Sequence, residues 1–161
     1  MKYAIKAHYA APSQVLMKMF ADKSYHSRKL EGLGIPKHEI LECSKQGNAF
    51  RIKIQFALPI QAPGMVKKMV SADTKVTQEE EWDTARGSGR ISVSTHGMPV
   101  EMTCQATASD DARGCLLTND WTIVARIPLI GGSLEKFICT DLQGRAEKEQ
   151  RVINSLLDQY R

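Results

Sequence analysis

The sequence predicts an α+β fold in which a curved antiparallel sheet of about seven strands wraps around one long C-terminal helix. Three observations carry this prediction. A strand-like segment opens the chain, and two short helical segments follow it. Further segments with the period of two that is typical of strands come next. The final segment repeats its apolar residues at helical spacing. Because one helix cannot fill a broad concave face, we also expect an apolar cavity between helix and sheet.

The opening elements follow from alternation and from helix signals. Apolar residues alternate with polar ones between Tyr3 and Tyr9, which predicts a strand. Pro12 ends this strand, and Ser13 is expected to cap a first helix that reaches about Phe20. A second short helix is predicted over residues 24–30, before a pair of glycines.

The central part of the chain predicts strands over residues 40–45, 49–58, 75–84, 91–95, 100–106 and 115–127. Turn residues predict connections at 46–48, 87–89 and 109–114. Residues 65–70 are expected to form a short turn of helix.

The connection to the last helix lies in residues 126–136, RIPLIGGSLEK. Pro128 removes a backbone donor, so the preceding strand should end near it. The glycines at 131–132 predict a hinge, and Ser133 is the expected N-cap. A continuous helix from Ser133 to Tyr160 would be roughly 40 Å long at ~1.5 Å per residue, which is enough to cross a sheet.

Composition narrows the class of protein. A chain of 161 residues suits one domain, 1–161, and its apolar content of 42% and charged content of 25% are ordinary for a soluble globular protein. The net charge of +4 is modest and the basic residues are scattered, with few aromatic residues among them. This pattern offers no stripe for phosphates and no platform for stacked bases, so we expect no nucleic-acid binding.

The sequence predicts a cytoplasmic protein that holds no metal and no cofactor. No apolar run reaches the ~20 residues that span a bilayer, and the N-terminus lacks the apolar core of a signal peptide. The cysteines show no CxxC pair, and we expect all of them to be reduced thiols: Cys43, Cys104, Cys115 and Cys139. The histidines fit no metal-binding spacing: His8, His26, His38 and His96. No Gly-x-Ser-x-Gly elbow is present, so no catalytic nucleophile is assigned.

Several segments carry a resemblance to a known superfamily. Residues 11–15, APSQV, join the first strand to the first helix, and the order of elements covers the whole chain. In these features the chain resembles the START-like, or SRPBCC, helix-grip superfamily of polyketide cyclase and lipid-transfer type. Trp82 at the end of a strand, GMPV at 97–100 and IPLIGGSLEK at 127–136 resemble an uncharacterised bacterial subfamily of it, a domain of unknown function. The resemblance implies a helix-grip fold with a cavity, but it does not name the occupant.

The phase of the predicted strands and helix selects the residues expected to line this cavity, whose volume should fall within the ~300–1,000 Å³ typical of ligand pockets. The apolar lining residues are Phe50, Ile52, Ile54, Trp82, Val93, Met102, Leu117, Trp121, Phe137 and Ile138. Two polar residues share this phase and could jointly hold a polar head group: Glu80 and Asn119.

Both polar residues have alternative interpretations. An inward Glu80 would be desolvated, which raises its pKa and suits a general acid or base, whereas a run of three glutamates at 79–81 is more often a solvated edge. Asn119 could bind a ligand carbonyl, or it could satisfy backbone groups or a buried water.

The first functional hypothesis is a non-enzymatic binder or carrier of an apolar or amphipathic small molecule, such as a lipid or an isoprenoid. A cyclase or aromatase that uses the same cavity is the second hypothesis, and an interaction module whose cavity has closed into core is the third. The basic pair Lys67 and Lys68, near Met65, Val66 and Met69, could touch anionic lipid during ligand exchange, or it could be a solvated loop.

Overall fold

The computed structural model describes residues 1–57, 64–67 and 74–161. Its strands form one seven-stranded sheet in the order β1-β7-β6-β5-β4-β3-β2, and every neighbouring pair is antiparallel. The strands are β1 (Lys2–Tyr9), β2 (His38–Gln46), β3 (Ala49–Ala57), β4 (Lys75–Asp83), β5 (Ser88–Thr95), β6 (Val100–Asp111) and β7 (Gly114–Ala125). This sheet confirms the predicted fold class.

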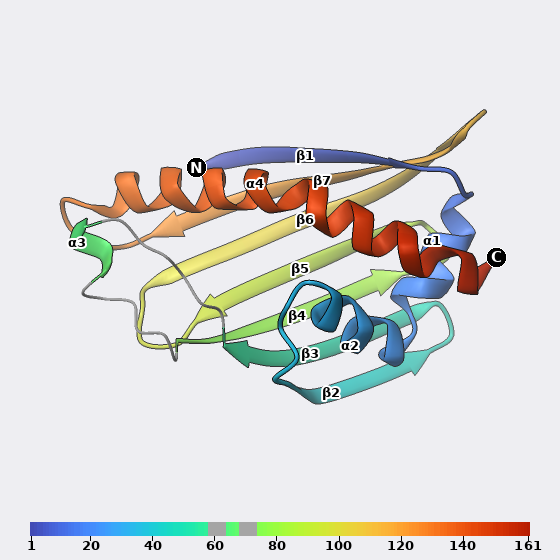
Figure 1. Ribbon diagram of the computed structural model, residues 1–161, viewed down its shortest axis with the longest axis horizontal. Coiled ribbons are helices and arrows are strands. Elements are labelled where there is room, and N and C mark those ends of the chain that lie inside the picture. Colours follow the sequence, from blue (N-terminus) through green and yellow to red (C-terminus); the bar gives the residue numbers. More distant parts are fainter. Residues whose placement is uncertain (58–63, 68–73) are drawn as a thin grey trace.

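The helices lie on one side of the sheet. They are α1 (Ser13–Phe20), α2 (Lys23–Gly32), α3 (Gly64–Lys67) and α4 (Gly131–Leu157), which a short 3₁₀ helix (Asp158–Tyr160) extends. In Figure 1, α4 runs lengthwise in front of β1, β7 and β6, while α2 lies in front of the strands at the other edge. None of the described helices covers the left-hand part of β4 and β5 in this view.

Two packed clusters stand at opposite ends of the concave face. The larger one joins α1, α2 and the end of α4 to the sheet, and its fully buried members include Leu16, Met19, Tyr25 and Ile52. The smaller one consists of Val100, Ala125 and Leu134, where α4 begins. The long helix is therefore anchored to the sheet at both ends.

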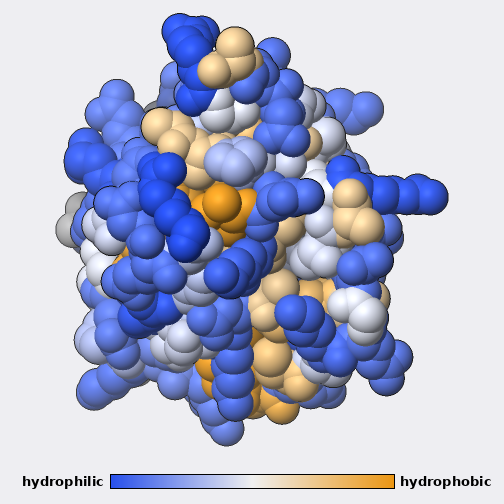
Figure 2. All heavy atoms as spheres, turned by 90° about the vertical axis from the view of Figure 1, so that its right-hand side faces the viewer, coloured by the Kyte–Doolittle hydropathy of each residue, from blue (hydrophilic) through white to orange (hydrophobic). Residues whose placement is uncertain are grey.

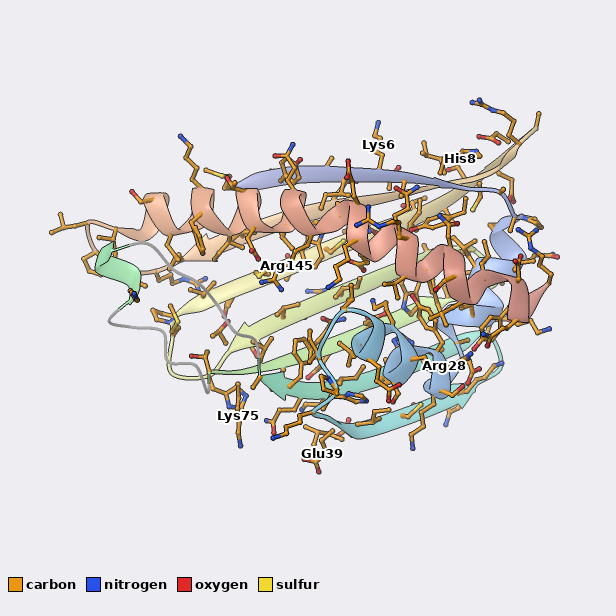
Figure 3. The ribbon with its side chains drawn as sticks, viewed as in Figure 1. Lys6, His8, Arg28, Glu39, Lys75 and Arg145 are labelled. Atoms are coloured by element: carbon orange, nitrogen blue, oxygen red, sulfur yellow. The ribbon has the colours of Figure 1, made fainter. Side chains whose placement is uncertain are left out.

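The edge strands carry charged residues that discourage pairing with another sheet. Figure 3 shows Lys6 pointing outward from β1 and Glu39 pointing outward from β2. The register between β2 and β3 shifts between Ile40 and Glu42, and such a bulge also interrupts an edge. The end of the molecule near α1 and the C-terminus is mostly hydrophilic, with smaller apolar areas between the polar side chains (Figure 2).

The predicted cap of α1 is wrong. Pro12 is the N-cap residue and makes no side-chain cap hydrogen bond. Ser13 is instead the first helical residue, and its backbone N–H and Oγ each donate to the carboxylate of Asp110 at 2.7 Å. The orphan donors at the start of α1 are thus partly satisfied by the end of β6, which lies far away in sequence.

The predicted hinge before α4 is also displaced. The helix begins at Gly131 rather than at Ser133, and Gly131 lies so close to β7 that an added Cβ would stand 2.5 Å from the carbonyl oxygen of Ala125. The left-handed turn belongs to Leu129, with φ of 70°, so Gly131 permits close packing and the chain turns two residues before it.

Two predicted turns are shorter than expected. The segment at 87–89 belongs largely to β5, which begins at Ser88, and the segment at 109–114 is mostly strand. Only Ala112 and Arg113 separate β6 from β7, because Asp111 Oδ1 accepts a hydrogen bond from the Arg113 N–H at 2.8 Å and closes a local turn.

Three further predictions concern the cysteines, membrane-spanning helices and the basic segment. All four cysteines are free, as predicted. Along the described ranges, no helix combines the length and the apolar character required to cross a bilayer. Of the basic segment, Lys67 ends α3 and is exposed, whereas Lys68 and Met69 lie outside the described residues.

Candidate ligand-binding site

The predicted site residues of the sheet all lie on the face that turns toward α2 and α4. Six of them are buried: Phe50, Ile52, Ile54, Glu80, Trp82 and Leu117. The other sheet residues of the set are half-buried: Val93, Met102, Asn119 and Trp121. Phe137 and Ile138 on α4 are half-buried and pack against the smaller cluster.

An apolar stretch of the concave face remains accessible to solvent between the two clusters. Val93 and Met102 face each other across β5 and β6, and Gln78 lies on the other side of Val93. All three side chains are half-buried, although they share the inward face. This is the region of β4 and β5 that no described helix covers (Figure 1).

Glu80 is inward, buried and fully partnered. It is 3% exposed, and its Oε2 accepts a hydrogen bond from Trp82 Nε1 at 2.8 Å while its Oε1 accepts one from Gln78 Nε2 at 2.6 Å. Burial alone would raise the pKa of Glu80, but the charge of Lys29 and these two hydrogen bonds hold the pKa below its ordinary value. The carboxylate is therefore ionised, which differs from the raised pKa expected for an acid or base.

His26 faces the same carboxylate from α2. Its Nε2 lies 2.7 Å from the carbonyl oxygen of Phe20, so Nε2 carries the proton and Nδ1 is left with a lone pair in the neutral ring. Nδ1 has no hydrogen-bond partner and lies 4.0 Å from Glu80 Oε1. Burial lowers the pKa of His26 and outweighs the attraction of Glu80.

Aromatic rings enclose this pair. The Phe20 and Trp82 rings lie 4.8 Å apart between centroids, and His26 stacks on Phe50 at 5.8 Å with an interplanar angle of 10°. The Trp82 ring lies over Gly89 of the neighbouring strand, where an added Cβ would stand 2.3 Å from the ring. Gly89 therefore makes room for the indole that binds Glu80.

A half-buried cation, Lys29, lies near this buried carboxylate. Lys29 Nζ lies 3.3 Å from Glu149 Oε1 on α4 and 5.9 Å from the centroid of the Tyr25 ring. Burial alone would lower the pKa of Lys29, but Tyr25, Glu149 and Glu80 raise it, so the ammonium stays charged. The hydroxyl of Tyr25 is buried without a hydrogen-bond partner.

Glu80 and Asn119 are not brought together. Glu80 is on β4 and Asn119 is on β7, and β5 and β6 separate them. At ~4.8 Å between neighbouring strands, the two positions are about 14 Å apart across the sheet. Asn119 Oδ1 is nevertheless buried with no hydrogen-bond partner, so it is an unsatisfied acceptor on the inward face.

Sequence reasoning missed the α2 contribution to the site. His26 was considered only as a metal ligand, and Tyr25, Lys29 and Gln78 were not selected. The period of two does place Gln78 in phase with Glu80, so that residue could have been found from the sequence. Nothing in the sequence, however, pairs α2 with β4.

A cavity that the described residues outline lies elsewhere. It is a shallow depression of about 510 Å³ whose lining includes Arg51, Glu81, Arg90 and Gln105. These four side chains lie opposite one another on β3, β4, β5 and β6, in the phase that faces away from the helices. This depression is on the convex face and is not the predicted cavity.

Within the ranges that the structure describes, no cluster of three or more His, Cys, Asp or Glu side chains could hold a metal ion. Gln78, Glu80 and Trp82 are instead hydrogen-bonded to one another.

The family model described as "Protein of unknown function (DUF2505)" matches residues 4–157. The chain belongs to this family. The DUF2505 chain is 31% identical over 105 residues to proteins described as uncharacterized from Mycobacterium tuberculosis and Mycobacterium bovis. These matches cover 62% of the DUF2505 chain and 60% of the relatives' own length.

Solved structures share the fold of the DUF2505 chain. The Zhui aromatase/cyclase from Streptomyces sp. R1128 matches with a TM-score of 0.61 and 12% identity, over 99% of this chain and 93% of that one. Ara h 8.0201 matches with a TM-score of 0.61 and 11% identity, over 96% and 98%. A protein from Mycobacterium smegmatis matches with a TM-score of 0.65 and 14% identity, over 99% and 92%. The DUF2505 chain thus has the helix-grip fold.

Proposed function

We propose that this protein binds an apolar or amphipathic small molecule of lipid-like character on the concave face, between the sheet and α4. The observation that carries the proposal is the half-buried apolar stretch at Val93 and Met102. These side chains face inward, yet solvent still reaches them, and a bound apolar molecule would remove this surface from water. An interaction module with a closed core would bury them.

The polar groups favour binding over catalysis. A general acid or base must reach a substrate proton and exchange its own. Both oxygens of Glu80 already accept hydrogen bonds from the protein, and aromatic rings surround it. Glu80 therefore acts as a permanently ionised group that orients neighbouring side chains on the binding face, and not as a group that exchanges protons with a substrate. An aromatase/cyclase has a similar fold, and at 12% identity that likeness concerns the fold alone.

The test uses two variants that differ only in the face they alter. Val93→Gln puts an amide on the concave face, whereas Ser94→Gln puts the same group on the convex face of the same strand. We expect the wild type and Ser94→Gln to bind an environment-sensitive apolar dye with equal affinity. Val93→Gln should lower the affinity for the dye by about tenfold, because a polar group then lies where apolar contact was made.

The unfolding free energy of each variant checks that a lost signal reflects the site and not the fold. Native mass spectrometry of protein purified from its own host would identify a co-purifying ligand. Absence of dye binding to the folded wild type, or equal weakening by both variants, would contradict the proposal and favour the closed-core alternative.

A further inference from the structure

The hydrogen bonds of Glu80 fix the orientation of the Gln78 amide at the edge of the accessible apolar stretch. Gln78, Glu80 and Trp82 point to the same face of β4. A carboxylate can only accept hydrogen bonds, so the contact of 2.6 Å between Gln78 and Glu80 assigns the amide nitrogen of Gln78 to Glu80. The amide oxygen of Gln78 is thereby directed away from Glu80.

That oxygen is a strengthened acceptor. Hydrogen bonds in a low-dielectric interior polarise one another, and an amide that donates to an ionised carboxylate becomes a better acceptor at its oxygen. Among the described residues, no hydrogen bond reaches the Gln78 oxygen, and the side chain is half-buried beside Val93. The apolar stretch therefore ends at an acceptor that none of the described residues satisfies.

Among the residues that the structure describes, two cations near the concave face are each paired with a carboxylate. Lys29 is paired with Glu149 at 3.3 Å, and Arg145, which projects from α4 across the front of the sheet in Figure 3, is paired with Asp141 at 3.0 Å. Glu80 has only neutral donors and the imidazole of His26 for neighbours within contact distance. Among these described groups the carboxylates exceed the cations by one.

We propose that the head group bound at this end of the site is a hydrogen-bond donor, a hydroxyl or an amine, held by the Gln78 amide oxygen. A carboxylate or phosphate head group would bring another acceptor toward Gln78 and a negative charge toward Glu80. The proposal rests on the proposed function and names the chemical class of its ligand. Glu80 is a positioning residue here, since it orients and polarises Gln78 without contacting the ligand.

The test compares three probes with one tail and different head groups: decanol, decylamine and decanoate, with decanol used below its solubility limit and the two ionic probes below their micelle concentrations. Their ability to displace the apolar dye is measured near pH 8, where decanoate is ionised. We expect the alcohol and the amine to bind at least about tenfold more tightly than the acid, since a donor can pair with the Gln78 oxygen whereas a carboxylate brings an acceptor and a negative charge toward it. Tighter binding of the amine than of the alcohol would identify a charged head group.

A matched pair of variants tests whether Gln78 causes the preference for decanol over decanoate. Gln78→Met keeps the length of the side chain and removes the amide, while Gln105→Met makes the same change on the convex face of β6. Gln78→Met should reduce the difference between decanol and decanoate to less than about threefold, and Gln105→Met should leave it unchanged. If Gln78→Met does not fold, Gln78→Asn, which withdraws the oxygen by one methylene, serves the same comparison.

The outcomes separate this inference from the proposed function. If decanoate binds as tightly as decanol or more tightly, the inference is overturned while the apolar site stands. If the preference for decanol persists in Gln78→Met, another group holds the head and the assignment to Gln78 is overturned. If no probe displaces the dye from the folded wild type, both proposals are overturned together.

Discussion

The Nδ1 atom of His26 lies 4.0 Å from the Oε1 atom of Glu80, and both side chains are almost completely buried. The His26 ring is fixed by its contact of 2.7 Å with the carbonyl oxygen of Phe20, so its lone pair faces an ionised carboxylate. This contact joins α2 to β4 at the point where the helical pair docks on the sheet.

The protonation of His26 should make the stability of the fold depend on pH. The folded-state pKa of His26 is lowered by burial, so the unfolded chain binds this proton more readily. The stabilising contribution of the neutral His26 ring is fully present above the unfolded pKa of ~6.5. It is lost as the pH falls, and the free energy of unfolding then decreases by at most about 1.4 kcal/mol per pH unit. The lowered pKa of Glu80 acts with the same sign below about pH 4.5.

Urea unfolding at pH 7.5 and pH 5.5 measures this effect. His26→Gln retains a donor that can reach the Phe20 carbonyl but cannot titrate, so it should flatten the difference between the two pH values. His96→Gln, which alters an exposed ring hydrogen-bonded to Thr77, should leave the difference unchanged. An equal pH dependence in the wild type and His26→Gln would contradict the assignment.

The hydrogen bond from Trp82 to Glu80 should contribute to stability as a coupled pair. Trp82→Phe removes the Nε1 donor and leaves Glu80 Oε2 unsatisfied, which costs about 1–3 kcal/mol in a buried site. Glu80→Gln should also destabilise the fold. Because both single variants break the same contact, the double variant should lose about 1–2 kcal/mol less than the sum of the two. Additive losses in a double-mutant cycle by urea unfolding would show that the contact contributes little.

Gly89 should not tolerate a side chain. An added Cβ would lie 2.3 Å from the Trp82 ring, so Gly89→Ala must displace the indole and should cost about 1–3 kcal/mol. Gly144→Ala is the matched control, because an added Cβ there meets no atom within 4 Å. In the interior of α4 that change should stabilise the protein by up to about 1 kcal/mol. Thermal unfolding of both variants checks the opposite signs.

Leu129 should be replaceable by glycine with a gain in stability. It is fully exposed and has φ of 70°, a conformation that costs an L-residue roughly 1–2 kcal/mol. Glycine removes that cost and adds backbone entropy to the unfolded chain, so Leu129→Gly should gain about 0.5–1 kcal/mol. Leu41→Gly, at another exposed leucine but within β2, should instead destabilise the fold. A loss of stability in Leu129→Gly would show that the loop uses the leucine side chain.

The alternation of the central strands was sufficient to predict the sheet, because one face of each strand is buried and its residues must repeat every two positions. The segment from Phe50 to Phe56 shows this most plainly, and there the inward residues are the predicted ones. Helix starts were predicted less well. Ser13 and Ser133 have the chemistry of caps, but Asp110 and the close approach of Gly131 to Ala125 determined where the helices begin.

The sequence by itself determined the order of elements and the antiparallel sheet, since both depend on local periodicity. It also placed Glu80 in phase with Trp82, but the run of glutamates left the direction of Glu80 open. Only the tertiary structure decided what Glu80 contacts. His26 and Glu80 are separated by 54 positions in the chain, and they meet because the helical pair packs on the sheet, with His26 of α2 stacked on Phe50 and Phe20 of α1 against Trp82. The same packing keeps Asn119 away from Glu80, because β5 and β6 lie between them. Periodicity fixes the face on which a side chain lies, but the neighbours on that face depend on how distant elements pack.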